Sequence, residues 1–434
     1  MAYLSLRHTD TDTRPAEIIM KASKQKQITY NTAGNIVTLF CQWLILMIVP
    51  KITDFSEAGV FAVALSICSI LNIFATFSLN TYQISDQYTK YEENDYRATR
   101  LVTVVLSFGL CAAVVLFFNY TWEQNLVIIL YMVYRNLLHY AYLHTATLQI
   151  RERLDYVGKC MMLEGVMSFI SFITVYYVTH DLVLSTGVMA VLGGGIFLLS
   201  VVYGYQKIEG RRYPWQPAER TAVSSLLKIG TPLLLSIVAP TIITAIPKIM
   251  LQGTDGNEIA GIFSTLSTPT IVIPTLIMGI FAPFIVYFSN LSRKGDMATL
   301  RKQYSKMAGL VLLLGTVCYF ISRFAAGSVF EMVYGGDIVP YVKYFDILIL
   351  GIAFYSIGMW GITILITKEQ GKAAAIASVT ALAISFVIFF TVIPEYGISG
   401  ATYGLMAAYG IFGMIISVCV LFLPIRTAAT LDTV

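Results

Sequence analysis

The chain has 434 residues, of which 57% are hydrophobic and 12% are charged, with a formal net charge of +4 and a mean hydropathy of +0.72. A soluble domain carries roughly 25% charged residues. The composition therefore excludes an ordinary soluble protein and predicts an all-α, polytopic membrane protein. The sequence has no HExxH and no GxxxxGK[ST] pattern, so a zinc enzyme or a single-chain ATP-driven pump is not expected, and no cofactor is predicted.

A helix needs about 20 mainly apolar residues to cross a bilayer. Twelve segments meet this requirement, in chain order 30–50, 58–81, 100–119, 125–150, 159–178, 183–205, 225–251, 258–289, 304–325, 339–366, 372–393 and 399–423. They predict two six-helix bundles with polar segments around them, in the order 1–29, bundle 30–205, linker 206–224, bundle 225–423 and tail 424–434. Two such halves suggest a transporter whose site lies between them near the middle of the membrane.

The positions of Lys and Arg predict the orientation of these segments. If residues 1–29 are cytoplasmic, 24 of the 29 basic residues lie in segments on the cytoplasmic side, and Lys51, Arg323 and Lys343 lie on the outer side. This asymmetry follows the positive-inside rule. We therefore expect both termini to be cytoplasmic.

The two remaining basic residues fall inside predicted spans, and Arg135 is the clearer candidate for a functional site. A charge in the membrane costs about 2.5–3.5 kcal/mol on insertion scales, so its presence indicates a function. Tyr131, Arg135, His139 and Tyr142 recur at helical spacing and share one helix face. A cation, an imidazole and two phenols suit an anionic, hydroxyl-rich ligand. The alternative is an interhelical ion pair with aromatic packing around it.

Lys248 is the second basic residue within a span, and it directly follows Pro247. It either extends to the outer interface or turns inward between the two halves. Span one adds polar candidates for the substrate site, namely Asn31, Asn35 and Gln42.

Two carboxylates within spans are candidates for ion coupling, Glu164 and Asp346. Glu164 lies about 7 Å from the inner end of the predicted span 159–178, whereas Arg135 lies about 22 Å from the inner end of its own span. This difference in depth predicts no direct pair between Glu164 and Arg135. Asp346 is expected to face the space between the halves, with Lys343 as its partner.

Residues 225–289 carry six of the chain's 13 prolines. A proline inside a helix removes a backbone hydrogen bond and bends the helix. Pro240 and Pro247 are seven residues apart and therefore lie nearly on one face. We expect them to act as a hinge in span seven, although proline is also simply commoner in membrane helices.

Several segments resemble the polysaccharide transporter family, the Wzx-type flippases of lipid-linked oligosaccharides, within the superfamily that also contains multidrug exporters. The segments that carry the resemblance are TYQISDQYTKYEENDYRATR (81–100), IPKIML (246–251), FAPFIVYFSNLSRKGDMATLRKQY (281–304), VYGGDIVPYVKYFDILILGIAF (333–354) and PEYGISGATYG (394–404).

The resemblance implies two six-helix bundles around a cationic central cavity and alternating access between the membrane faces. The implied substrate is a short glycan on undecaprenyl diphosphate, with Arg135 and Lys248 facing the phosphates. Asn31, Asn35 and Gln42 would replace the cations that richer members of the family carry in spans one and two. The implied partners are membrane lipids and the polymerase and glycosyltransferases of a cell-surface polysaccharide, and the implied location is the bacterial plasma membrane.

Three alternatives remain open from the sequence. A multidrug exporter of the same superfamily would need an acidic cavity for organic cations. A major-facilitator transporter would carry a GxxxDRxGRR pattern between spans two and three, which residues 82–100 lack. A membrane glycosyltransferase or polymerase would need a large outer loop, and no predicted outer loop is long enough.

Overall fold

The computed structural model describes residues 23–424 except 87, 89, 119, 210–218, 282 and 283. The remaining parts of the predicted N-terminal segment, linker and tail lie outside the described residues. All regular elements of the described residues are helices. Those of the first half are α1 (Lys24–Ile52), α2 (Phe55–Thr76), α3 (Leu79–Asp86), α4 (Glu93–Phe117), α5 (Trp122–Ile150), α6 (Leu154–Thr179), α7 (Leu182–Met189), η1 (Ala190–Gly194) and α8 (Gly195–Glu209).

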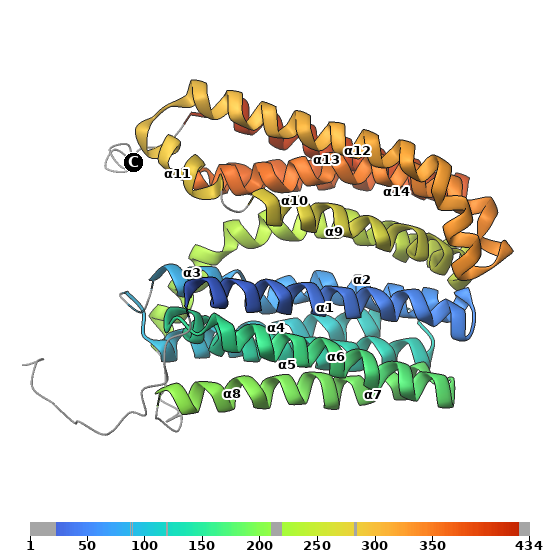
Figure 1. Ribbon diagram of the computed structural model, residues 1–434, viewed down its shortest axis with the longest axis horizontal. Coiled ribbons are helices and arrows are strands. Elements are labelled where there is room, and N and C mark those ends of the chain that lie inside the picture. The colour runs from blue at the N-terminus through green and yellow to red at the C-terminus, as the bar shows by residue number, and fades with distance from the viewer. Residues whose placement is uncertain are drawn as a thin grey trace, which may run out of the picture.

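The second half begins with α9 at Arg220 and lies beside the first half (Figure 1). Its elements are α9 (Arg220–Ser267), η2 (Thr268–Ile271), α10 (Val272–Phe281), α11 (Phe284–Lys294), α12 (Met297–Tyr334), η3 (Gly336–Tyr341), α13 (Val342–Thr367) and α14 (Gly371–Phe422).

Ten helices in the described part of the chain are long and apolar enough to cross a membrane. Two of these, Arg220–Met278 and Gly371–Phe422, have 59 and 52 residues, far more than the roughly 20 that one crossing needs. Each contains a glycine with non-helical backbone angles, Gly256 at φ 88° and Gly397 at φ 53°. Glycine tolerates positive φ because it has no Cβ, so the chain can reverse there. Twelve crossings remain a prediction.

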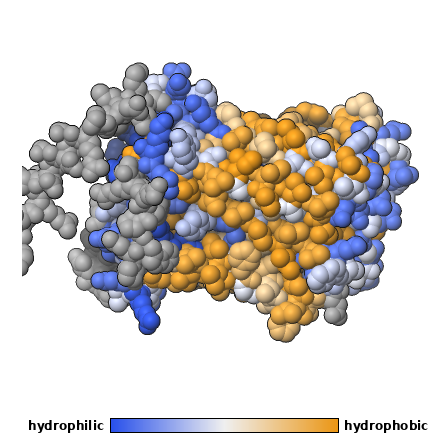
Figure 2. Space-filling view, turned by 90° about the horizontal axis from the view of Figure 1, so that it is seen from below, coloured by the Kyte–Doolittle hydropathy of each residue, from blue (hydrophilic) through white to orange (hydrophobic). Residues whose placement is uncertain are grey.

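The molecule has two polar ends and an apolar belt between them (Figure 2). We call the end at which α1 begins and α14 ends the tail end, and the end with the turn at residues 53–54 the far end. Asp54 caps α2 at the far end, where its Oδ1 accepts a 2.9 Å hydrogen bond from the Glu57 amide. Such caps satisfy backbone N–H groups that have no partner within the helix.

Each half has its own apolar core. Phe61, Met132 and Phe172 belong to the core of the first half, and Phe263 and Trp360 to that of the second. The halves meet mainly where α2 packs against α9. A third, smaller cluster joins the halves near the tail end, because it combines Phe77, Tyr96 and Leu143 of the first half with Leu226, Leu234 and Val238 of the second.

Candidate functional site

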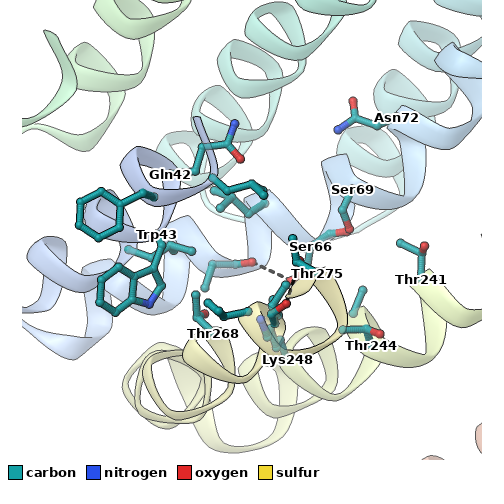
Figure 3. A pocket seen from close by; sticks show the side chains of 18 of the residues that line it. Gln42, Trp43, Ser66, Ser69, Asn72, Thr241, Thr244, Lys248, Thr268 and Thr275 are labelled. Atoms are coloured by element: carbon teal, nitrogen blue, oxygen red, sulfur yellow. Dashed lines mark hydrogen bonds between the residues drawn. The ribbon is translucent and has the colours of Figure 1, made fainter. Parts of the chain in front are cut away.

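A cavity of about 490 Å³ lies between the two halves in the apolar belt. In the first half its walls come from α1, α2 and α5; in the second they come from α9, η2, α10 and α13. Figure 3 shows the labelled side chains of α1, α2, α9, η2 and α10 around it. Its polar side chains other than the charged ones are Gln42, Ser66, Ser69, Asn72, Tyr131, Thr241, Thr244, Thr268, Thr275 and Tyr355. The cavity therefore offers hydroxyl and amide groups within walls that are otherwise apolar.

The charged side chains among the described residues of the cavity wall are Arg135 and Lys248, and both are cations. Lys248 is 8% exposed, and no hydrogen bond or ion pair links its amine to another described residue. The guanidinium of Arg135 likewise forms no ion pair with a described carboxylate. Two unpaired cations in an apolar wall favour an anionic ligand.

Lys248 thus takes the inward position of the two that the sequence left open. It lies on α9 with Thr241 and Thr244 at spacings of three and four residues, so the three side chains share one face. All three line the cavity (Figure 3). The sequence already shows Thr241 and Thr244 at helical spacing before Lys248. This pattern would have identified the two threonines as candidate residues of the site.

The predicted stripe on α5 is divided by the structure. Tyr131 and Arg135 line the cavity, whereas His139 and Tyr142 are not in its wall. His139 is 2% exposed and its ring lies 5.8 Å from that of Tyr142. Tyr142 also packs against Phe197 at 5.8 Å. His139 and Tyr142, the last two residues of the stripe along the chain, are therefore packed inside the first half. Substrate contact by these two residues stays a prediction.

The predicted amides of α1 are divided in the same way. Gln42 lines the cavity, and Asn31 and Asn35 do not. Asn35 donates a 3.0 Å hydrogen bond to the carbonyl of Asn31 one turn earlier. Trp43 and Tyr355 were missed by the sequence analysis, and both lie in the wall. An aromatic residue in an apolar span gives no signal that distinguishes a cavity wall from ordinary packing.

Glu164 is 3% exposed and lies at a junction of α1, α5 and α6. It accepts hydrogen bonds from the hydroxyls of Thr38 at 3.3 Å, Ser168 at 3.1 Å and Tyr134. Tyr134 directly precedes Arg135, so the predicted separation in depth was too large. The reason is that α6 begins at Leu154, five residues before the predicted span, which places Glu164 about 15 Å along the helix.

The expectation for Asp346 was wrong in its partner and in its position. Its Oδ1 accepts a 2.5 Å hydrogen bond from Ser322 and its Oδ2 lies 3.5 Å from Nη1 of Arg323. Asp346 is not in the cavity wall. Arg323 was counted on the outer side because it lies two residues before the end of the predicted span 304–325, but α12 continues to Tyr334 and Arg323 lies well within it. Lys343 lies instead over the Tyr344 ring, at 5.1 Å.

Pro240 and Pro247 both lie within α9 and are buried. The backbone angles of α9 depart from helical values only at Gly256. The hydroxyl of Thr244 donates a 3.0 Å hydrogen bond to the Pro240 carbonyl. The two prolines are thus accommodated in a continuous helix, and their role as a hinge stays a prediction.

No protein-family profile matches the chain. A capsular polysaccharide biosynthesis protein, CapF of Staphylococcus aureus, is 22% identical over 390 residues, which cover 87% of this chain and 94% of that protein.

Among solved structures, the chain is similar to a multidrug resistance MATE family transporter of the MOP superfamily. The inward-facing conformation of such a transporter superposes with a TM-score of 0.68 at 12% identity, covering 93% of this chain and 95% of the other. An outward-facing conformation superposes with a TM-score of 0.60 at 13% identity, covering 94% and 96%. The likeness shows that the chain shares its fold with these transporters, whose structures include an inward-facing and an outward-facing conformation.

Proposed function

We propose that the protein is a flippase that moves oligosaccharide linked to undecaprenyl diphosphate from the inner to the outer leaflet, for synthesis of a cell-surface polysaccharide such as a capsule or O-antigen. The observation that carries this proposal is the charge of the cavity, whose described wall contains Arg135 and Lys248 and no carboxylate. A cavity built for organic cations would need the opposite charge.

The chemistry of the cavity suits each part of such a substrate. A guanidinium can hold phosphate oxygens through two parallel hydrogen bonds, and an ammonium acts as a point charge beside them. Trp43, Tyr131 and Tyr355 offer flat faces for sugar rings, and the hydroxyls of α2 and α9 offer partners for sugar hydroxyls. The apolar remainder of the wall leaves these interactions unscreened by bulk water.

The cavity also reaches the apolar surface of the molecule. Leu39 and Phe40 of α1 and Leu276 of α10 line the cavity and are 44%, 53% and 59% exposed. A side chain that lines the cavity and is also exposed on the outer apolar surface marks an opening from the cavity toward the lipid. A polyprenyl tail can therefore stay in the bilayer while the charged head group enters the cavity.

The direction of transport follows from the proposed orientation. The distribution of Lys and Arg favours cytoplasmic termini in a bacterial plasma membrane. The cell interior is negative, so outward movement of the anionic head group is favoured by about 2.3 kcal/mol per charge per 100 mV. The likeness to a capsular polysaccharide biosynthesis protein supports the same role, with glycosyltransferases supplying the substrate and a polymerase consuming the product.

Depletion of the protein in its host provides the direct test. We expect a lipid-linked oligosaccharide to accumulate in the inner leaflet, as measured by extraction of labelled glycolipids and by their protection from an external periodate or lectin probe. An unchanged glycolipid pool, together with loss of organic-cation export, would favour the multidrug exporter instead.

Variants of the two cations test the site within this function. In liposomes containing undecaprenyl-diphosphate oligosaccharide, Arg135→Ala and Lys248→Met should each lower flipping about 10–100-fold, the value of one charge-assisted contact. Lys207→Met is the matched control, because Lys207 is an exposed cation on α8 away from the cavity. Flipping by Arg135→Ala at the control rate would contradict the assignment of the phosphate site.

A further inference from the structure

At the far end, α2 and the part of α9 that follows Gly256 touch through their backbones. A Cβ atom at Gly59 would lie 1.9 Å from the carbonyl oxygen of Asn257, and one at Gly261 would lie 1.8 Å from the carbonyl oxygen of Phe55. Real Cβ atoms essentially never come closer than 3.0 Å to another heavy atom. The obstacles are backbone atoms, so no neighbouring side chain can move aside to make room.

This contact joins the two halves, since Gly59 belongs to the first and Gly261 to the second. Polar side chains surround it. Oδ1 of Asn257 accepts hydrogen bonds from Nε2 of Gln124 at 3.3 Å and Nε2 of Gln252 at 2.7 Å. Gln124 is at the far end of α5 in the first half, so the amide of Asn257 links the halves a second time.

The contact lies directly beyond the cavity. On α2, the residue of the cavity wall nearest to Gly59 in sequence is Ala62, and on α9 Lys248 is followed one turn later by Gln252. Apolar contacts complete the closure. Phe55 lies with its ring 6.3 Å from that of Tyr334, and Ile249 packs against the core of the first half.

We propose that the contact between Gly59 and Gly261, with the amide of Asn257 beside it, is a latch that closes the far end of the cavity and parts during transport. Small residues let two helices approach until their backbones touch. The glycine contact itself interlocks no large side chains, so separating it moves only Phe55 and Ile249 out of the opposite half's core, and water can replace the amide hydrogen bonds. This inference needs a transporter that opens at both ends and does not depend on which substrate it carries.

The alternative is that the glycines serve only fixed packing. An added methyl group would then lower the stability of the protein without opening the cavity toward the far end. Under the latch proposal the methyl group prevents closure and shifts the population toward the state that is open at the far end.

The test uses the full chain with its six native cysteines replaced by serine and with Ser69→Cys as a reporter in the cavity wall. A membrane-impermeant maleimide is applied to intact cells and, separately, to inverted vesicles. Gly59→Ala and Gly261→Ala should raise the labelling rate from the far-end side about tenfold or more. Gly253→Ala is the matched control, because Gly253 lies in α9 just before the reversal at Gly256 with no atom within 4 Å of its added Cβ.

The proposed orientation places the far end outside the cell, so the rise is expected in intact cells. A rise found in inverted vesicles instead would support the latch and reverse the orientation. Labelling of both glycine variants at the rate of Gly253→Ala, in protein that elutes as one folded species, would overturn the latch.

Asn257→Ala provides a second arm if the glycine variants do not fold. It adds no bulk and removes the acceptor of both amide hydrogen bonds, so we expect labelling from the far-end side to rise about fivefold. Labelling of Asn257→Ala at the control rate would also overturn the proposal. No outcome of these measurements depends on the identity of the substrate, so failure of the latch and failure of the flippase function are distinguishable.

Discussion

Single residues in this membrane protein take their roles from their partners more than from their charge. Arg135 and Lys248 line the cavity without a carboxylate partner, whereas Arg100 is wholly buried and both of its terminal nitrogens have hydrogen-bond partners. Nη1 of Arg100 donates to the carbonyls of Ala75 and Thr76 at 2.7 and 2.9 Å, and its Nη2 donates to Asn80. Arg100 therefore caps the carbonyls left without partners at the end of α2.

Replacing Arg100 should affect stability rather than substrate specificity. Arg100→Met leaves buried carbonyls unpaired, so we expect the free energy of unfolding in detergent to fall by about 2–3 kcal/mol. Denaturation monitored by tryptophan fluorescence measures the change. Arg293→Met is the control, since Arg293 is exposed near the end of α11. Equal stability of the two variants would show that Arg100 contributes nothing beyond a surface charge.

Glu164 is the residue that we propose for ion coupling. Its carboxylate is held by hydroxyls from α1, α5 and α6, so a change in its charge reaches three helices at once. Glu164→Gln keeps the size of the side chain and removes the charge. We expect transport by this variant to become independent of an imposed proton or sodium gradient, as measured in liposomes with and without the gradient. A response equal to that of the unmodified chain would exclude Glu164 from coupling.

At the scale of the helix, the prolines of α9 determine where that helix can bend. Three prolines lie inside α9, at 232, 240 and 247, and each removes one backbone hydrogen bond. Pro240 and Pro247 lie on either side of Thr244 in the segment that lines the cavity. A helix with missing bonds bends more easily at that point than elsewhere. Lys248 would then move with the far-end part of α9.

Replacing both prolines tests this hinge. Pro240→Ala combined with Pro247→Ala restores two backbone donors, so we expect transport to slow severalfold while the yield of folded protein changes little. Flux in liposomes and yield from gel filtration are the two measurements. Pro232→Ala is the control, because Pro232 is in the same helix but lies nine residues before Thr241, the first residue of α9 in the cavity wall. Equal losses of flux and yield in the double variant would leave the prolines with a role in folding alone.

The whole molecule is two helical halves with a cavity between them, and its topology depends on the chain reversals at Gly256 and Gly397. Asp255 and Gly397 lie side by side, since a Cβ at Gly397 would be 2.8 Å from Oδ1 of Asp255. The two reversals thus share one end of the molecule. The turn at Glu369, between α13 and α14, belongs to the other end.

Single cysteines at these turns test the count of twelve crossings and the orientation together. Asp255, Glu369 and Tyr396 are all exposed. In intact cells an impermeant maleimide should label Asp255→Cys and Tyr396→Cys but not Glu369→Cys, and inverted vesicles should give the reverse pattern. Labelling of Asp255→Cys and Glu369→Cys from one side would contradict the predicted topology.

The sequence by itself determined the class of the protein and its apolar helical segments, and it singled out Arg135 and Lys248 as charges within them. It could do so because a backbone in lipid must satisfy its own hydrogen bonds, so a long apolar run becomes a helix whatever its neighbours are. An unpaired charge in such a run is costly enough to be visible as a site without coordinates.

Only the tertiary structure decided which polar residues meet. Asn35 and Gln42 are seven residues apart on α1 and alike in chemistry, yet only Gln42 lines the cavity. The same holds for Arg135 and His139, and for the pairing of Asp346 with Arg323 in place of Lys343. Packing against helices from distant parts of the chain sets how each helix is rotated about its axis and how deep its ends lie in the membrane. Hydropathy alone does not predict that packing.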